Sequence, residues 1–360
     1  MKIVRSHALA FVLLLTLAVG LGCTTNSQLP DPATSSSTSS TTEMSTTTST
    51  PAATTTATSA PTVPSSFVAG PDPLRARQTH IAQLDLPTVW PRASGAGQII
   101  AVVDTGVDLT HPDLQSNLVE GINLVTPNTP PQDDNGHGTH VAGIAAAVTG
   151  NALGVSGVAP LAKIMPVKVL DKVGSGTTAT IAAGIDWATE HGATVINLSL
   201  GSSGPGSRLT KGGEINPALR RAATAGVVIV SASGNESTLK RDYRAGVDVI
   251  VVDACDQNGK PADFTNAGDP RAVAAPGVDI LSTSPIAATD IWPKGTAGYE
   301  TLSGTSMASP VVAGTAAMLR SAGVPAAEVL ERLAATAKNP DNDIRLGAGV
   351  IAPSAALGSA

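Results

Sequence analysis

The sequence predicts an α/β protein with three layers, in which helices flank a mostly parallel central sheet. Three observations point to this fold class. Short apolar runs rich in β-branched residues recur along the chain, helical stretches separate them, and only 14% of the 360 residues are charged while 42% are hydrophobic. Continuous apolar runs that alternate with helices are typical of parallel strands buried on both faces.

The expected elements follow one another from about residue 67 onward. Strands are expected at the short Val- and Ile-rich runs Gln98–Val103, Ile164–Val169, Thr194–Leu198, Gly226–Ser231 and Val249–Val252, and helices at the Ala-rich runs Val141–Val148, Thr178–His191, Pro217–Thr224 and Val311–Leu319. Helical crossovers therefore separate the strands. In sheets of this kind, functional side chains gather where strands end and loops begin.

The first 22 residues are expected to be a signal peptide rather than part of the fold. Lys2 and Arg5 precede an apolar run, Ala8–Leu21, that is too short to span a bilayer comfortably. The run ends at Gly22-Cys23, which resembles a bacterial lipoprotein leader, in which the cysteine becomes the lipid-modified first residue of the mature chain. The resemblance implies an extracytoplasmic protein, anchored in the cell membrane through a lipid on Cys23, with plain secretion as the alternative.

Residues 23–66 consist mainly of Ser, Thr, Ala and Pro. A segment of this composition cannot bury a hydrophobic core, so a disordered tether is expected. Such a tether would hold the folded domain, residues 67–360, away from a membrane or wall.

Charge and cysteine content exclude several classes of protein. The net charge is −6, and removal of the leader leaves 20 basic and 28 acidic residues, so a nucleic-acid partner is not expected. The two cysteines, Cys23 and Cys255, lie far apart and match no metal-ligand spacing, which excludes a disulfide scaffold and a zinc ribbon. Cys255 is expected to be a buried free thiol.

Two motifs carry an acid and a base. Asp104 closes an apolar strand, where a carboxylate is costly to bury unless it is hydrogen-bonded, although a helix-capping Asp would look the same. His137 lies between two glycines, and its spacing to His140 raises metal binding as an alternative. Zinc-protease helices carry His-Glu-x-x-His, however, and this segment does not. His140 is therefore expected to be a packed structural residue.

A third motif contains a nucleophile, in the segment Gly304-Thr305-Ser306-Met307-Ala308-Ser309-Pro310. The fixed φ of Pro310 suits the first turn of a helix, so Ser306 is expected at or just before a helix N-terminus. Backbone N–H groups and the positive end of the helix dipole would then point at the reacting group. Taken alone, this motif is equally consistent with an ordinary N-cap serine.

Together, Asp104, His137 and Ser306 are the residue types needed to activate a serine hydroxyl, because the imidazole accepts the hydroxyl proton and the carboxylate orients the imidazole. Their order along the chain resembles that of the subtilisin-like serine proteases, or subtilases. The flanking sequences also resemble that family: Asp-Thr-Gly, His-Gly-Thr-His-Val-Ala-Gly and Gly-Thr-Ser-Met-Ala-Ser-Pro. The resemblance extends from Pro71 to near the C-terminus. The resemblance implies a monomeric endopeptidase that cleaves proteins or peptides through an acyl-enzyme and needs no cofactor for catalysis.

The resemblance also implies further site residues. Asn235 would complete the oxyanion hole with the backbone N–H of Ser306. A peptide would bind as an added strand, with its side-chain slot walled by small residues. The residues implied in substrate binding are Gly174, Ser175 and Gly176, then Ser199, Leu200 and Gly201, and finally Ala232, Ser233 and Gly234.

A structural calcium ion is a further implication of the resemblance. Asp72, Asp113 and Asn151 fall where subtilases gather oxygen ligands for calcium, and hard oxygen donors suit that ion. Surface Asp residues in turns are the alternative explanation.

Two other functions remain consistent with the sequence. A non-catalytic adhesin or scaffold that kept the fold would also explain the tether. An esterase would share the nucleophile chemistry, although the order of the motifs and the glycines for strand binding favour a peptide substrate.

Overall fold

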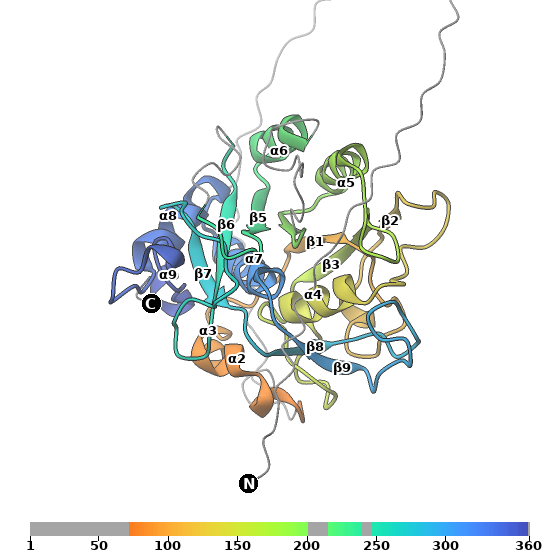
Figure 1. Ribbon diagram of the computed structural model, residues 1–360, viewed down its shortest axis with the longest axis horizontal. Coiled ribbons are helices and arrows are strands. Elements are labelled where there is room, and N and C mark those ends of the chain that lie inside the picture. The colour runs from red at the N-terminus through yellow and green to blue at the C-terminus, as the bar shows by residue number, and fades with distance from the viewer. Residues whose placement is uncertain (1–71, 201–214, 240–246, 359–360) are drawn as a thin grey trace, which may run out of the picture. The chain divides into compact units, whose positions relative to one another are not determined.

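The computed structural model describes residues 72–200, 215–239 and 247–358 of the chain. Within these residues, helices pack on both faces of one large sheet, as the sequence predicts (Figure 1). The leader, the tether, Cys23 and Gly201 lie outside the described residues. No helix among the described residues is long and apolar enough to cross a membrane.

The central sheet has seven strands in the order β2-β3-β1-β4-β5-β6-β7, and every neighbouring pair is parallel. The strands are β1 (Ile99–Asp104), β2 (Ile122–Asn123), β3 (Lys163–Lys168), β4 (Val195–Leu198), β5 (Val228–Ala232), β6 (Ile250–Cys255) and β7 (Val273–Pro276). Because all the strands run the same way, their carboxyl ends meet at one edge. A separate antiparallel pair consists of β8 (Ile280–Thr283) and β9 (Tyr299–Leu302).

Helices cover the sheet on both sides. The α-helices are α2 (Thr79–Gln83), α3 (Leu86–Val89), α4 (His137–Ala146), α5 (Thr178–Glu190), α6 (Ile215–Thr224), α7 (Thr305–Ser321), α8 (Ala326–Thr336) and α9 (Pro353–Ala356). Short 3-10 turns lie at Arg75–Arg77, Gln115–Asn117 and Ile344–Leu346. Along β1, Ile100 and Val102 pack into the core that contains α4 and α7, whereas Ala101 and Val103 pack into the core that contains α5 and α6. This alternation follows from the pleat of the strand.

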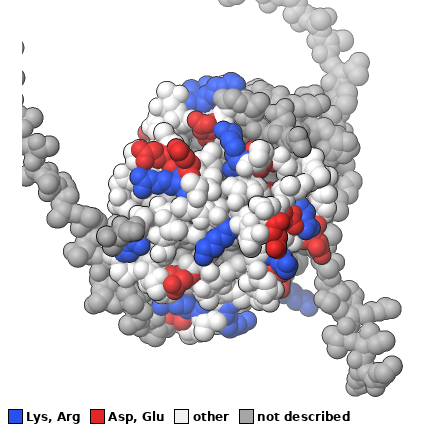
Figure 2. Space-filling view, turned by 90° about the vertical axis from the view of Figure 1, so that its left-hand side faces the viewer, with Lys and Arg blue, Asp and Glu red and all other residues white. Residues whose placement is uncertain are grey.

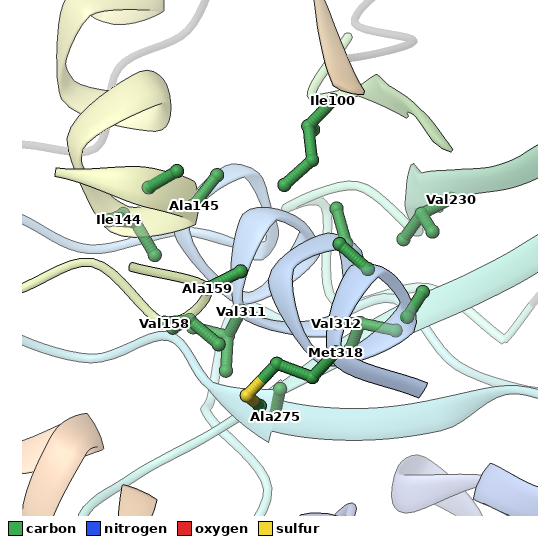
Figure 3. Close-up of a cluster of buried hydrophobic side chains, with 14 of the residues drawn as sticks. Ile100, Ile144, Ala145, Val158, Ala159, Val230, Ala275, Val311, Val312 and Met318 are labelled. Carbon is green, nitrogen blue, oxygen red and sulfur yellow. The ribbon is translucent and has the colours of Figure 1, made fainter. Parts of the chain in front are cut away.

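Helix α7 lies at the centre of the larger core. Its residues from Thr305 to Leu319 are all buried, as expected of a helix that is apolar on every side. Figure 3 shows Val311, Val312 and Met318 of α7 in one cluster with Ile100, Val230 and Ala275 of the sheet and with Val158. This packing holds α7 against strands β4 to β7.

Two helix starts differ from the sequence prediction. Helix α4 begins at His137, four residues before the expected start at Val141. Gly136, with φ 114°, is its N-cap residue. Helix α7 begins at Thr305, so the expectation that Pro310 occupies its first turn is wrong, and Pro310 lies inside the helix. Ser306 nevertheless lies at the helix N-terminus, as expected.

Surface charges of both signs are interspersed on the face shown in Figure 2. Ion pairs near the C-terminus include Arg332–Glu328 and Arg345–Asp343. This arrangement leaves no continuous basic region on that face.

Candidate active site

The carboxyl edge of the sheet brings the three motif residues and Asn235 to the ends of their elements. Asp104 is the last residue of β1, His137 is the first residue of α4, and Ser306 is the second residue of α7. Asn235 follows the end of β5 by three residues. The site is therefore assembled from four elements that are distant in the sequence.

The acid and the base are in direct contact. His137 Nδ1 lies 2.8 Å from Asp104 Oδ1, and this oxygen also accepts the backbone N–H of Thr105 at 2.7 Å. Asp104 is fully buried. Burial alone would lower the pKa of His137, but the charge and hydrogen bond of Asp104, together with the charge of Asp133, outweigh it and raise the pKa above its usual 6.5.

The loop before His137 is held by a second buried carboxylate, that of Asp133. Its Oδ1 accepts the backbone N–H groups of Asn135 and Gly136 and the hydroxyl of Thr105 at 2.9 to 3.0 Å. Its Oδ2 accepts the backbone N–H and the hydroxyl of Thr139 at 2.9 and 2.6 Å. Asp133 therefore binds the unpaired N–H groups at the start of α4 and links them to the loop after Asp104.

Lys168 connects the loop after Asp104 with the loop before His137. Its buried Nζ donates to the Thr105 carbonyl at 2.6 Å, to Asp134 Oδ1 at 2.7 Å and to the Leu170 carbonyl at 3.0 Å. Thr105 follows Asp104 in sequence, Asp134 lies in the loop before His137, and Leu170 lies in the segment that leads to Gly174. One cation thus fixes three loops of the site relative to one another.

The Ser306 hydroxyl donates to the Ser199 carbonyl at 3.3 Å and has no hydrogen bond to His137 among the described contacts. In the absence of substrate, catalytic hydrogen bonds are often long or turned aside. Rotation about the Cα–Cβ bond changes the direction of the hydroxyl without moving the helix.

The backbone of Ser306 is held through an unusual contact. Pro310, four residues later, has no N–H to donate to the Ser306 carbonyl, and the Ser199 hydroxyl donates to it instead at 2.8 Å. Asn197 extends this network, because its Nδ2 donates to Ser199 Oγ at 2.9 Å and its Oδ1 accepts the Ser309 hydroxyl at 2.8 Å. All of these groups are buried. A buried network of hydrogen bonds therefore holds the backbone of Ser306 in place.

Two N–H donors converge beside Gly304. The amide oxygen of Asn235 accepts the backbone N–H and the hydroxyl of Thr305 at 2.9 and 3.0 Å, which fixes the orientation of the amide group. A Cβ atom added to Gly304 would lie 3.5 Å from Asn235 Nδ2 and 3.6 Å from the backbone nitrogen of Ser306. Both nitrogen atoms therefore lie near one point beside Gly304, which makes them the candidate donors for an oxyanion.

The described substrate-binding candidates lie at the ends of β4 and β5 and in the loop after β3. Ser199, Leu200, Ala232, Ser233 and Gly234 are buried at the ends of β4 and β5, and Gly174, Ser175 and Gly176 form a loop after β3. The turn at Gly174–Gly176 is closed by bonds between Asp171 and Ser175 at 2.9 Å. Ser199 contacts Ser306 directly, and the backbone N–H of Gly234 donates to the hydroxyl of the neighbouring Thr305 at 3.1 Å.

The second histidine of the motif is packed inside the protein. His140 is fully buried, its Nε2 lies 3.1 Å from the Glu300 carbonyl, and burial lowers its pKa to about 3. Within the described parts of the chain, no group of three or more His, Cys, Asp or Glu side chains is arranged to hold a metal ion. Cys255 is a buried free thiol, as expected.

The calcium candidates lie together around the loop after α4. Asn151 Nδ2 donates to Asp113 Oδ1 at 2.7 Å, and the backbone N–H of Gly150 donates to Asp72 Oδ1 at 2.8 Å. Burial raises the pKa of Asp113 to about 6, and the charge of Asp72 contributes in the same direction. Asp72 also forms an ion pair with Arg75 at 2.6 Å.

Four residues that support the site, Asp133, Lys168, Asn197 and Thr305, were not predicted from the motifs. Asp133 lies four residues before His137, and Thr305 directly precedes Ser306, so closeness in sequence was an available signal for these two. Lys168 is the last residue of the apolar strand β3, and Asn197 lies inside the apolar strand β4. Only the pairing of the strands brings them to the site.

Comparison with known proteins agrees with the geometry. Residues 95–349 match the family model described as the subtilase family. Thermitase from Thermoactinomyces vulgaris is 43% identical over 263 residues, which cover 73% of this chain and 88% of that protein. Subtilisin Savinase from Lederbergia lenta is 41% identical over 242 residues, which cover 67% of this chain and 82% of that protein.

A solved structure of a protease from Pseudoalteromonas arctica is similar, with a TM-score of 0.70 and 32% sequence identity, over 80% of this chain and 98% of that chain. The family match, the two relatives and the shared fold lead to one conclusion. The chain belongs to the subtilase family and is a subtilisin-like serine endopeptidase.

Proposed function

We propose that Asp104, His137, Ser306 and Asn235 carry out the endopeptidase reaction of this chain. His137 accepts the hydroxyl proton as Ser306 Oγ attacks the peptide carbonyl, and Asp104 stabilises the resulting imidazolium. Asn235 Nδ2 and the Ser306 backbone N–H bind the oxyanion. His137 then gives its proton to the leaving amine, and a water molecule, deprotonated by His137, hydrolyses the acyl-enzyme.

The contact that carries this proposal is the 2.8 Å hydrogen bond between His137 and the buried carboxylate of Asp104. A buried carboxylate at this distance holds one tautomer, leaving Nε2 as the proton acceptor. The converging donors beside Gly304 support the same assignment independently. A non-catalytic adhesin would need neither arrangement.

Replacement of the nucleophile tests the assignment. Ser306→Ala should lower kcat for a peptide substrate by about 10⁶-fold, which is the loss known for removal of the nucleophilic serine from a subtilisin. Ser354→Ala, which changes an exposed serine of α9, is the matched control and should retain full turnover. Appreciable amide hydrolysis by Ser306→Ala would refute the assignment. Turnover of esters without amides by the unaltered protein would favour an esterase.

We also propose that Asp72, Asp113 and Asn151 hold a structural calcium ion. The two carboxylates are buried, and their mutual repulsion helps to raise the pKa of Asp113. A cation would relieve this repulsion, and oxygen donors suit calcium. The residues present therefore fit the ion, with Arg75 as a competing partner for one oxygen of Asp72.

A chelator titration tests the calcium proposal. In the Ser306→Ala background, which prevents self-digestion, removal of calcium should lower the melting temperature by several degrees, because a ligand bound only by the folded state stabilises it. Asp113→Asn should abolish most of that shift. An unchanged melting temperature on chelation would exclude the site.

For residues 1–66 we propose a leader at 1–22, a lipid on Cys23 and a tether up to residue 66, with the monomeric peptidase domain beyond it. Support comes from the leader-like sequence and the Ser/Thr-rich composition. Mass spectrometry of the membrane fraction should find a diacylglyceryl group on Cys23. An unmodified N-terminus in the culture medium would indicate plain secretion instead.

A further inference from the structure

The loop between β8 and β9 places an indole ring beside the catalytic histidine. A Cβ atom added to Gly136, the residue before His137, would lie 2.6 and 2.7 Å from Cζ3 and Cε3 of Trp292. These distances mean that the ring packs directly on the backbone of Gly136. Any side chain at this position would displace it.

Hydrogen bonds fix the loop against the His137 segment. The backbone N–H groups of Asp290 and Ile291 donate to the carbonyls of Asp134 and Asn135 at 3.2 and 3.0 Å. The Trp292 carbonyl accepts two further N–H groups of its own loop, from Thr289 at 3.0 Å and Gly295 at 2.9 Å. Trp292 therefore has a defined position relative to the reacting atoms.

Trp292 remains half-buried, so part of the residue is open to solvent. The other two tryptophans are used differently. Trp90 is fully buried with its Nε1–H donating to the Val158 carbonyl at 3.0 Å, and Trp187 stacks on His191 with ring centroids 3.9 Å apart. The same loop also exposes Ile286, which is 52% accessible. Of these apolar groups, Trp292 is the one that contacts the residue before His137.

The position relative to the triad indicates which part of a peptide would meet the indole. The acyl part lies by Ser306 and the walls that include Ser199, whereas the imidazole delivers its proton to the departing amine. The chain that follows the scissile bond must therefore pass along the His137 side. Trp292 is attached to that side through Gly136.

We propose that Trp292 walls the cleft on the leaving-group side and selects apolar side chains at the first two positions after the scissile bond. This inference rests on the reaction proposed above. A large aromatic surface that is partly open to solvent binds apolar side chains well.

Two matched substrates test the proposal. One is a peptide with Leu at both positions after the scissile bond, and the other is a p-nitroanilide with the same acyl part and no residue after the bond. For Trp292→Ala, the ratio of kcat/KM for the peptide to kcat/KM for the anilide should fall by about tenfold, the lower range for loss of an apolar contact. Trp292→Phe should keep most of the ratio, and Trp187→Ala, the control, should keep all of it.

The possible outcomes are distinct. An unchanged ratio in Trp292→Ala overturns the proposal, and an equal fall for both substrates shows that Trp292 only supports the His137 loop. Cleavage-site profiling of the unaltered protein is a second test that needs no variant, and apolar residues should be enriched at those two positions. Absence of enrichment overturns the proposal as well. Failure of the catalytic assignment would be seen separately, as anilide turnover by Ser306→Ala.

Discussion

At the scale of single residues, the support of the nucleophile depends on a substitute hydrogen bond. Pro310 leaves the Ser306 carbonyl without a helical donor, and the Ser199 hydroxyl takes that place at 2.8 Å. Removal of this hydroxyl leaves a buried carbonyl unpaired, which costs about 1–3 kcal/mol. We therefore expect Ser199→Ala to lower kcat by about tenfold through displacement of the nucleophile.

A rescue experiment separates this explanation from a loss of substrate contacts. Pro310→Ala restores an N–H that can donate to the Ser306 carbonyl within α7. The double variant Ser199→Ala/Pro310→Ala should recover most of the kcat lost by Ser199→Ala. If the free-energy effects of the two single variants on kcat simply add in the double variant, the bond from Ser199 to the Ser306 carbonyl does not matter for kcat.

At the scale of elements, the predictable part of the fold is the part with a strong apolar pattern. The five expected strands correspond to β1, β3, β4, β5 and β6, with ends within two residues except at β6, which continues three residues beyond the expected end. Strands β2, with only two residues, and β7, at the other edge of the sheet, were not predicted, because short edge strands carry little pattern. The start of α4 was also missed, since Gly136 and the Asp133 carboxylate, rather than apolar periodicity, determine where that helix begins.

The same distinction applies to the site. The motifs predicted Asp104, His137 and Ser306 from their residue types, and the structure brings Asp104 and His137 into contact and places Ser306 at the start of α7. Neither the bond from Ser199 to the Ser306 carbonyl nor the position of Trp292 on Gly136 has a local signal. Both arise from contacts between segments more than 100 residues apart in sequence, which single-sequence periodicity does not encode.

Strand β6 contains a carboxyl group in an apolar setting. Asp253 is fully buried, and neither oxygen has a hydrogen bond of ordinary geometry among the described residues. Burial raises its pKa to about 8, the nearby Ser233 side chain offsets part of this, and the charge of Asp269 adds to it.

The substitution Asp253→Val tests how far this buried carboxyl group lowers the free energy of unfolding. Because the folded-state pKa lies above the usual 3.8, the folded state binds an extra proton between pH 3.8 and 8, and stability falls as pH rises through that range. In the Ser306→Ala background, Asp253→Val should remove this fall and raise the free energy of unfolding at pH 9 by about 2 kcal/mol or more. Equal pH dependence in urea titrations of the two proteins would contradict the assignment.

At the scale of the whole molecule, two buried histidines limit stability in acid. His80 and His140 are fully buried, and burial lowers the pKa of each to about 3. Between pH 6.5 and 3 the unfolded chain binds protons that the folded chain does not. The two histidines therefore do not reduce the free energy of unfolding above pH 6.5. Below that pH, each histidine lowers it by about 1.4 kcal/mol per pH unit.

His80→Leu tests this effect, again in the Ser306→Ala background. The loss of unfolding free energy between pH 7 and pH 5 should be smaller by about 2 kcal/mol in the variant, because one of the two proton-binding sites of the unfolded chain is gone. His191→Leu, which changes an exposed histidine, is the control and should leave the loss unchanged. If all three proteins lose equal stability, His80 does not contribute.

The central claim is that Asp104 and His137 activate Ser306, and the most direct measurement is the rate at which a peptidyl phosphonate labels the protein as a function of pH. We expect one label per chain, on Ser306, at a rate that falls in acid with a midpoint above pH 6.5, because the charge of Asp104 holds the pKa of His137 above that value. Labelling at another residue, or a rate that does not change with pH from 5 to 9, would contradict the account.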